Sequence, residues 1–561
     1  MDVTRDDVKR HLAETLRAAA RWQASARSLG GRHAGGLADP VSRTTMQWTE
    51  FFRLHVATAH AEIDAPAAEA ACLADGLVAF LARVQRPDGS FDAGFCGDLY
   101  QPCNAAFALR PLSDALVRWQ EVFPAATKET LRSVLARAAR ACVTGGQNTP
   151  NHRWVAAGGL AHASRALGDP SLLEAALGWT ACGIDVDEDG AYSEGSPNYA
   201  LVSADMLLDL EEIGGRADLG DVARRSLGYL RTVSMPGGGF ATVASTRYDT
   251  EGSTDSYARA ASVFGRLGAS DLAAAALGKL FASRAAPGVF APHVFPPAGA
   301  HAKGKLYPSV VTAIASESLL RWLRTGAAGA APEAPEAPQA VSRLRASGVF
   351  RYTAGRFAVA FGRGPNLLEV HAGSAVVEAT RILVHAFGWN GLYVASEDVT
   401  ADGVELALTS APGSAEIRLP QYLLAAPGER RAGSPIPVTR ARLRLRCGPG
   451  PRARLEIELE GPAGANALLE IGARPDQRLF SEDGAPLEAP VAAAAAGRTV
   501  LRGPGADLLV VAHEGGSGHA LQVGPYGYGA GDVPWSPSYH PTPLRIGFEV
   551  PGRLTVAFLL Q

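Results

Sequence analysis

At 561 residues the chain exceeds the size of a single ordinary core, so two or three domains are expected, each with a large apolar interior. Its 47% apolar and 19% charged residues are typical of globular proteins and exclude a largely disordered chain. The 53 basic and 56 acidic residues give a net charge of −3, so no global field attracts a polyanion, and nucleic acid is not an expected partner.

The N-terminal residues 1–10 alternate charged and apolar side chains, where a secretory signal needs an uninterrupted apolar stretch. No window approaches the roughly 20 apolar residues of a membrane span. Six cysteines without a C-x-x-C pair are typical of reduced core residues. We therefore expect a soluble, cytoplasmic protein without a metal or another cofactor. A periplasmic or secreted protein whose leader had been removed would have the same features.

The first 325 residues carry the apolar spacing of about a dozen amphipathic helices. The clearest predicted helices span residues 6–28, 66–85, 104–121, 125–144, 152–167, 171–185, 198–214 and 219–233. The next residues, 326–340, combine small residues with repeated Pro and have no apolar periodicity, which predicts a domain linker.

Residues 341–561 have the pattern of a different kind of domain. Segments such as Ala441-Arg-Leu-Arg-Leu-Arg446 and Arg454-Leu-Glu-Ile-Glu-Leu-Glu460 alternate with period two and are separated by Gly and Pro turns. This pattern predicts an antiparallel β-sandwich. The expected fold class is therefore α+β and multidomain, with a toroid domain (1–325) followed by a sandwich domain.

Helix starts in the first domain recur with a period near 47 residues. The starts are Pro102-Cys-Asn104, Thr149-Pro-Asn-His152 and Ser196-Pro-Asn-Tyr199, and their prolines are 48 and 47 residues apart. Pro suits the first helical position, where its missing N–H would be unsatisfied anyway. A period of this length fits one helical hairpin, so the three helices run parallel and begin at the same end. Helices in such hairpins predict an α/α toroid.

A second repeat lies in the loops that precede these helices. Asp88-Gly-Ser-Phe91, Asp189-Gly-Ala-Tyr192 and Gly238-Gly-Phe240 each place an aromatic residue shortly after a turn glycine.

The two complete helix starts are candidate functional positions. If Thr149 and Ser196 are N-caps, His152 and Tyr199 occupy the third helical position of adjacent inner helices. Both then lie at the positive end of a helix dipole, which suits an anionic ligand. The alternative is that Ser/Thr-Pro-Asn is simply a good helix start whose aromatic ring packs on a neighbour.

Other polar residues surround these starts. Arg153 follows the His, Glu194 precedes the Tyr, and Arg247 falls 48 residues after Tyr199. Each also has a structural interpretation: a packed or ion-paired Arg153, a loop ion pair for Arg247, and a capping carboxylate for Glu194.

Three segments of the toroid domain resemble one family. They are Asn148-Thr-Pro-Asn-His-Arg-Trp154, Asp185-Val-Asp-Glu-Asp-Gly-Ala-Tyr-Ser-Glu-Gly-Ser-Pro-Asn-Tyr199 and Ser245-Thr-Arg-Tyr-Asp249. Together they resemble the heparinase II/III-like polysaccharide lyases, which pair a helical toroid with a β-sandwich. The resemblance covers both domains in architecture, and its specific motifs lie between about residues 88 and 250.

The resemblance implies β-elimination on a uronic-acid-containing oligo- or polysaccharide. In this family an Asn or His neutralises the uronate carboxylate, and a Tyr, often with a second His, moves the proton. By position these residues are Asn151, His152 and Tyr199. A His-Gly-His-like segment is expected in the β domain, but this chain has His371 and His385 in separate segments, so the second His stays unassigned.

The chemistry requires cations near these residues. A site that removes the weakly acidic C5 proton must stabilise the dianion that forms, with donors aimed at the carboxylate. A Tyr base has a reference pKa of about 10, and the gap to neutral pH is worth about 4 kcal/mol. A helix dipole contributes at most about 2 kcal/mol. Arg153, Arg247 or a protonated His152 are the available cations.

The predicted site therefore has two groups of residues. The predicted catalytic residues are His152, Tyr199, Asn151 and Arg247. The predicted substrate-binding residues are Arg153, Trp154, Tyr192, Glu194, Asn104 and His385.

Two other functions remain open. An inverting glycoside hydrolase on the same toroid would draw two carboxylates from Asp189, Glu194, Glu251 and Asp255. A non-catalytic glycan-binding protein would hold sugars on Trp154, Tyr192 and Tyr199. The sequence does not define the glycan, the endo or exo mode, or the oligomeric state.

Overall fold

The protein was analysed as a computed structural model. It describes residues 2–28, 34, 36, 47–91, 103–119, 122–144, 150–236, 239–245, 252–294, 308–325, 340–363, 366–385, 392–400, 402–409, 438–463, 465–474, 477–487, 491–492, 496–503, 505, 507–515 and 543–561.

The chain divides into two compact units. The first, which we call the helical unit, contains Met1–Phe240, Ser245–Pro296 and Ala302–Ala334. The second, the sandwich unit, contains Ala241–Ala244, Pro297–His301 and Pro335–Gln561. The predicted linker, residues 326–340, lies outside the described residues except for Ala340.

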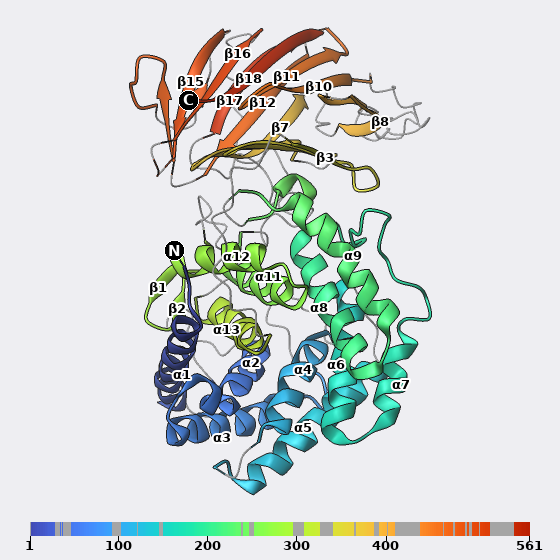
Figure 1. The fold of residues 1–561 in the computed structure, drawn as a ribbon, viewed down its shortest axis with the longest axis vertical. Helices are drawn as coiled ribbons and strands as arrows, with labels where there is room; N and C mark the ends of the chain where they lie inside the picture. Colours follow the sequence, from blue (N-terminus) through green and yellow to red (C-terminus); the bar gives the residue numbers. More distant parts are fainter. Residues whose placement is uncertain are drawn as a thin grey trace, which may run out of the picture. The chain divides into compact units, whose positions relative to one another are not determined.

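Within the part of the chain that the structure describes, six inner helices form a closed ring in the helical unit (Figure 1). They contact one another in chain order, and the last contacts the first. The inner helices are α2 (Gln47–Thr58), α4 (Cys103–Val117), α6 (Pro150–Leu167), α8 (Pro197–Gly214), α11 (Thr254–Arg266) and α13 (Pro308–Arg324). This arrangement is the predicted α/α toroid.

Six further helices of the described residues pack outside this ring, each against an inner helix. They are α1 (Arg5–Ser28), α3 (Ala67–Val84), α5 (Ala125–Thr144), α7 (Pro170–Gly178), α9 (Ala217–Val233) and α12 (Ser270–Ala282). The unit also has one 3-10 helix, η2 (His60–Ile63), and one β-hairpin, which consists of β1 (Arg284–Ala286) and β2 (Val289–Phe290).

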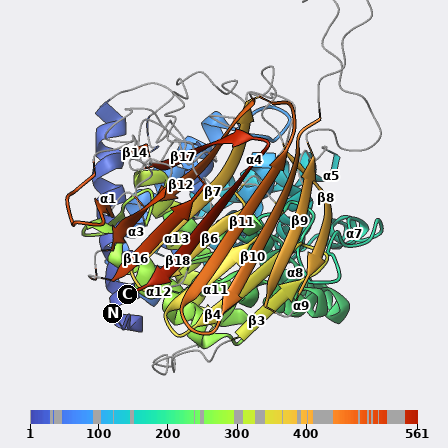
Figure 2. The same cartoon turned by 90° about the horizontal axis from the view of Figure 1, so that it is seen from above.

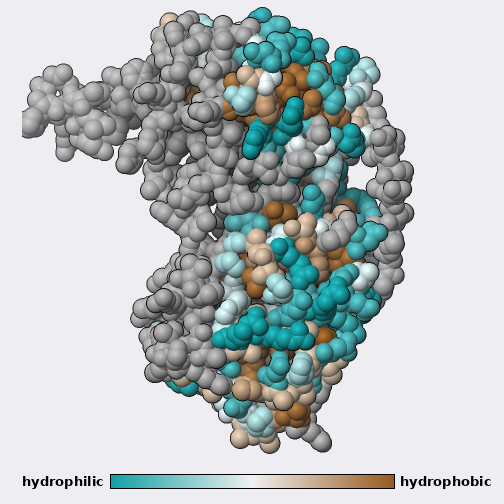
Figure 3. Space-filling model, turned by 90° about the vertical axis from the view of Figure 1, so that its left-hand side faces the viewer, coloured by the Kyte–Doolittle hydropathy of each residue, from teal (hydrophilic) through white to brown (hydrophobic). Residues whose placement is uncertain are grey.

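The predicted helices agree with these bounds to within two residues except at two C-terminal ends. The helix predicted over residues 104–121 is α4, which ends at Val117. The helix predicted to reach residue 185 is α7, which ends at Gly178. Residues 179–182 form turns, and Gly183 then adopts a positive φ of 78°, so the apolar residues that continue the pattern do not continue the helix. The face of the helical unit shown in Figure 3 mixes hydrophilic and smaller apolar areas, as expected for helices that bury one side.

The repeated loops of the toroid have a structural role. Gly89 and Gly190 both have φ near +90°, and a Cβ on either would lie within 3 Å of the backbone of the neighbouring outer helix, at Arg137 and Arg225. The aromatic residue after each turn is buried: Phe91, Tyr192 and Phe240 are 2%, 4% and 6% exposed. Glycine therefore allows the turn to approach the helix, and the ring anchors it in the core.

Two eight-stranded sheets form the sandwich unit, and Figure 2 shows strands of the first side by side. The first sheet has the order β13 (Arg478–Ser481), β15 (Ala496–Arg502), β16 (Leu508–Glu514), β18 (Gly552–Leu560), β11 (Arg452–Glu460), β10 (Arg440–Gly448), β9 (Gly403–Thr409), β8 (Tyr393–Val399). The second has the order β14 (Val491–Ala492), β17 (Pro543–Val550), β12 (Ala465–Ala473), β7 (Ala375–His385), β6 (Leu368–Ala372), β5 (Phe357–Phe361), β4 (Val349–Ala354), β3 (Ala340–Leu344).

Antiparallel pairing dominates both sheets, and β14 with β17 is a parallel pair. In β10 the buried residues alternate with outward arginines, as the sequence pattern predicted. Inward side chains of both sheets form one apolar core that includes Leu443, Leu455, Val370 and Leu469. The 3-10 turn η3 (Thr242–Ala244) belongs to this unit.

Among the described residues, no helix is long and apolar enough to cross a membrane.

Candidate functional site

The period of the helix starts continues down the inner helices and places residues at four levels. A level consists of the three residues, one each on α4, α6 and α8, that are 48 and 47 residues apart in the sequence, and we call these three residues level-mates. From the helix starts inward, the levels are Asn104, His152 and Tyr199; Phe107, Val155 and Val202; Arg110, Gly158 and Asp205; and Asp114, His162 and Asp209. Contacts between level-mates show that the helices run in parallel at equal depth: Arg110 bonds to Asp205 at 2.6 Å and His162 lies 3.2 Å from Asp114.

The first level contains the predicted catalytic pair. Ser196 is the N-cap of α8, and its Oγ accepts the N–H of Tyr199 at 3.4 Å, as predicted. α6 begins at Pro150, which gives His152 the equivalent third position. Both side chains are partly exposed. The imidazole of His152 packs edge to face on Phe107, with 5.4 Å between ring centroids.

Glu194 caps the start of α6, the neighbouring helix. Its Oε2 accepts the backbone N–H of Asn151 at 3.0 Å and the side-chain Nδ2–H at 2.6 Å. The carboxylate therefore lies at the positive end of α6, where it is favourable. Asn151 is 1% exposed, so its amide is held by the protein, and the expectation that Asn151 neutralises a substrate carboxylate does not fit this arrangement.

Arg153 and Trp154 have structural contacts. The guanidinium of Arg153 donates to the carbonyl of Gly183 and lies over the Trp154 ring, 4.1 Å from its centroid. Trp154 is 0% exposed, and its Nε1–H donates to Asp185 at 2.9 Å. A fully buried indole cannot stack on a sugar, so the prediction that Trp154 binds substrate is corrected. For Arg153 the packed-stem interpretation fits these contacts.

Tyr192 is a core residue and its predicted role in substrate binding is likewise corrected. Burial raises the pKa of its hydroxyl, which keeps it neutral. Two repeats earlier, in the loop before α4, the corresponding position holds the buried Phe91, so a ring without a hydroxyl fits there.

Three predicted site residues, and Glu251 of the hydrolase alternative, cannot be placed as side chains. Arg247 lies outside the described residues, and so does Glu251. Asn104 is in the first turn of α4, and His385 ends β7 opposite Asn466, but only their backbones are described.

The other candidate histidine of the β domain, His371, is buried in β6. Its Nε2 lies 2.6 Å from Glu369 Oε1, and burial lowers its pKa despite this carboxylate. The other oxygen of Glu369 accepts the backbone and hydroxyl hydrogens of Thr242 at 2.6 and 2.7 Å. The pair therefore attaches the η3 segment to the second sheet.

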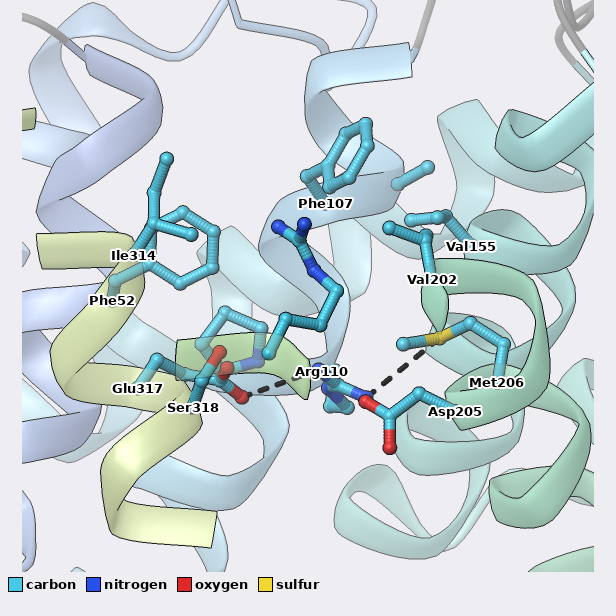
Figure 4. Close-up of a pocket in the computed structure, with 13 residues that line it drawn as sticks. Phe52, Phe107, Arg110, Val155, Val202, Asp205, Met206, Ile314, Glu317 and Ser318 are labelled. Carbon is cyan, nitrogen blue, oxygen red and sulfur yellow. Dashed lines mark hydrogen bonds and ion pairs between the residues drawn. The ribbon is translucent and has the colours of Figure 1, made fainter. Parts of the chain in front are cut away.

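A pocket lies inside the helical ring, and each inner helix contributes to its lining (Figure 4). The apolar lining residues are Phe52, Phe107, Val155, Val202, Met206 and Ile314, and the charged ones are Arg110, Asp205, Arg259 and Glu317. Phe107 both lines the pocket and contacts His152, so the pocket continues inward from the first level.

The floor of this pocket is a buried network of charges that the sequence analysis missed. Arg110 bonds to Asp205 at 2.6 Å and Asp209 at 3.0 Å and lies 3.4 Å from Glu317. Figure 4 shows Arg110 between Glu317 and Asp205. Arg266 and Arg321 contact the same two aspartates at 2.6 to 3.1 Å.

Mutual pairing sets the ionisation of this network. Burial disfavours the charged form of Asp209, but the nearby Arg321 and Arg266 outweigh it and hold the pKa of Asp209 well below its usual range. Burial also disfavours protonated His162, yet Asp114 and Asp209 raise its pKa. Asp209 therefore stays ionised beside its arginines.

Arg259 is the second cation that lines the pocket. It belongs to α11, where its Nη1 donates to Asn198 Oδ1 and its Nη2 lies 3.4 Å from Asp255 Oδ2. Asp255, one of the four carboxylates of the hydrolase alternative, is thus paired with an arginine. Extending the 48- and 47-residue period down the helices would have found the levels on α4, α6 and α8, but α11 follows after a different interval.

Among the described residues, no group of three or more His, Cys, Asp and Glu side chains is arranged to hold a metal ion.

No protein-family model matches the sequence, and no curated protein matches it. Solved structures do match the fold. A xanthan lyase from Paenibacillus is similar with a TM-score of 0.51 and 10% identity, over 97% of this chain and 57% of that one. The Streptomyces coelicolor A3 chondroitin AC lyase in complex with chondroitin sulphate has a TM-score of 0.48 and 12% identity, over 99% and 77%. The heparan sulfate lyase HepC from Pedobacter heparinus has a TM-score of 0.42 and 10% identity, over 92% and 76%.

At these identities the likeness establishes the fold alone. The chain has the toroid-type fold of polysaccharide lyases: a helical toroid followed by a β-sandwich.

Proposed function

We propose that this protein is a polysaccharide lyase that cleaves a uronic-acid-containing glycan by β-elimination. The observation that carries the proposal is the pair of parallel helix starts that holds His152 and Tyr199 at the same helical position, next to a pocket whose lining includes two arginines and two acids.

This arrangement suits the chemistry of elimination. The reaction removes the C5 proton, forms the C4–C5 double bond and expels the oxygen on C4, which takes up a proton. Tyr199 is the residue for proton transfer at C5 and at the leaving oxygen, and His152 is a second donor on the adjacent helix start. The N-terminus of α8, which is capped by the neutral Ser196, favours the negative charge that develops on the carboxylate.

The fold supports the same class of reaction. The xanthan lyase with which the chain shares its toroid and sandwich is itself a lyase that acts on a polysaccharide. Because fold does not define chemistry, the site has to be tested directly.

The test is a panel of uronic-acid glycans incubated with the purified protein. An elimination product contains a conjugated enoate, so ultraviolet absorbance should rise with at least one glycan and should not rise with its carboxyl-reduced form. New reducing ends without absorbance would indicate the hydrolase, and binding without any product would indicate the glycan-binding protein.

A further inference from the structure

We propose that Arg259 binds the uronate carboxylate in the pocket of the helical ring, a role that rests on the proposed lyase function and names its carboxylate-binding residue.

The other described groups that were candidates for the carboxylate already have partners within the protein. Asn151, which was expected to meet the carboxylate, holds Glu194, and Arg153 holds the Gly183 carbonyl and the Trp154 face. Arg110 is the other cation of the pocket lining, and it has three buried carboxylates within 3.4 Å. A substrate carboxylate that approached Arg110 would meet the repulsion of these groups.

Arg259 differs from Arg110 in its partners. Its contacts are a neutral amide oxygen, Asn198 Oδ1, and one carboxylate, Asp255, at the longer distance of 3.4 Å. A guanidinium has five N–H donors in a planar fork that matches a carboxylate, and these contacts use two of them. Asp205, the other acid of this part of the lining, is paired with Arg110 and Arg266, both at 2.6 Å.

The position of Arg259 is suited to the reaction. The residue that holds it, Asn198, directly precedes Tyr199 in the first turn of α8. Arg259 is thus bonded to the residue next to the predicted proton-transfer residue. The side chain is only 16% exposed and shares the pocket lining with apolar residues such as Val202 and Phe107, and a charge-assisted hydrogen bond at a site of low local dielectric is stronger than in water.

The geometry also gives Asn198 and Asp255 a positioning role. Asp255 is one turn before Arg259 on α11, and Asn198 lies across on α8, so the guanidinium is held between two helices before any ligand arrives. Preorganisation of this kind lowers the entropy cost of binding.

The experiment measures binding of free glucuronate and galacturonate, which have no glycosidic bond to cleave, by titration calorimetry or NMR. Each uronate is compared with its neutral sugar. The variants are Arg259→Gln, which removes the charge, and Arg259→Lys, which keeps the charge but not the fork. Arg224→Gln, an arginine 48% exposed in a surface ion pair, is the matched control.

The wild-type protein should bind a uronate more tightly than the neutral sugar. Arg259→Gln should lower uronate affinity at least about tenfold and leave the neutral sugar unchanged, Arg259→Lys should fall between, and the control should match wild type. Thermal melting tests whether each variant is folded. If Arg259→Gln does not fold, the uronate affinity of Arg259→Lys is the test of the inference.

Undiminished uronate affinity in a folded Arg259 variant, or no preference for uronate in the wild type, would overturn the inference. A protein that binds uronate through Arg259 but yields no elimination product from any glycan would contradict the lyase function while the binding role stands.

Discussion

His152 and Tyr199 occupy the same helical position one repeat apart, but their surroundings differ in one respect. His152 packs on Phe107, whereas Tyr199 follows Asn198, which holds a guanidinium. A tyrosine that exchanges a proton near neutral pH needs a nearby cation, because its reference pKa is about 10. We propose Arg259, which bonds to the adjacent Asn198, for this role. The sequence pointed to Arg153, Arg247 or a protonated His152.

Tyr199→Phe should abolish turnover and leave the fold nearly intact. The change keeps the ring and removes only the hydroxyl, and loss of general acid or base catalysis costs about 10²- to 10⁴-fold. Ser196 still caps α8, so stability should fall by at most about 1.5 kcal/mol. Steady-state rates and thermal melting on the same variant provide the measurement. A folded variant with full activity would remove Tyr199 from the mechanism.

His11 makes the helical unit sensitive to acid. Its ring is 0% exposed and packs on Phe290 and Phe281, with centroids 4.1 and 5.6 Å away. Burial, followed by the nearby Arg284, lowers the pKa of His11 to about 3. The unfolded chain takes up this proton near pH 6.5, so the contribution of His11 to stability is present above that pH and is lost as pH falls toward 3.

The variant His11→Phe should therefore flatten the pH dependence. From pH 8 to pH 5 the wild type should lose about 2 kcal/mol of unfolding free energy through this residue, and the variant should lose that much less. Denaturant unfolding of both proteins at the two pH values measures the difference. Buried His55 and His371, whose pKa values are also lowered, are present in both proteins and cancel. If the wild type and the variant had equal pH dependence, His11 would not be a buried neutral group whose protonation lowers stability.

At the scale of elements, close packing of the inner helices depends on a glycine pair in α6. A Cβ at Gly159 would lie 2.8 Å from Leu109 Cβ and 3.1 Å from the Ala106 carbonyl oxygen, and neither atom is the end of a flexible chain. A Cβ at Gly158 would lie 2.7 Å from Met206 Sδ. The two glycines thus set the distance from α6 to α4 on one side and to α8 on the other.

Gly159→Ala should destabilise the protein by about 1–3 kcal/mol, because overpacking outweighs the better helix propensity of alanine. Gly228→Ala in α9 is the matched control, since nothing lies within 4 Å of its Cβ position, and it should stabilise by up to about 1 kcal/mol. Thermal or denaturant unfolding of the two variants gives the signs. Two changes of the same sign would contradict the packing account.

The elements themselves were largely predictable, because they depend on local signals. Apolar spacing located the helices, Pro and Ser located the start of α8, and period-two alternation located strands such as β10. Roles that depend on distant partners were not predictable. Glu194 caps a helix 43 residues earlier, and Trp154 and Tyr192 are buried by neighbours that no local pattern reveals. Arg259 was not predicted as a site residue, because α11 does not follow the period of the preceding repeats.

At the scale of the helical unit, the buried charged network links inner helices to one another. Asp209 contacts Arg110, Arg266, Arg321 and His162 within 3.1 Å. Groups from α4, α6, α8, α11 and α13 therefore meet on one carboxylate. A buried network of this kind is costly to disturb, since removal of one charge leaves others uncompensated.

Asp209→Asn should lower the unfolding free energy by about 3–5 kcal/mol, because buried arginines lose a shared partner. The matched control is Asp271→Asn, which removes an exposed pair with Arg231 and should cost at most about 1 kcal/mol. Chemical unfolding of both variants measures the two costs. Equal, small effects would mean that the network does not hold the ring together.

The central claim is that the protein cleaves its glycan by elimination, and a mass balance on the products of one defined uronate oligosaccharide tests it most directly. Elimination consumes no water, so the masses of the two fragments should sum to the mass of the intact oligosaccharide, and no label should enter from ¹⁸O-water. Fragments whose masses sum to that of the oligosaccharide plus one water, with ¹⁸O in the new reducing end, would contradict the account.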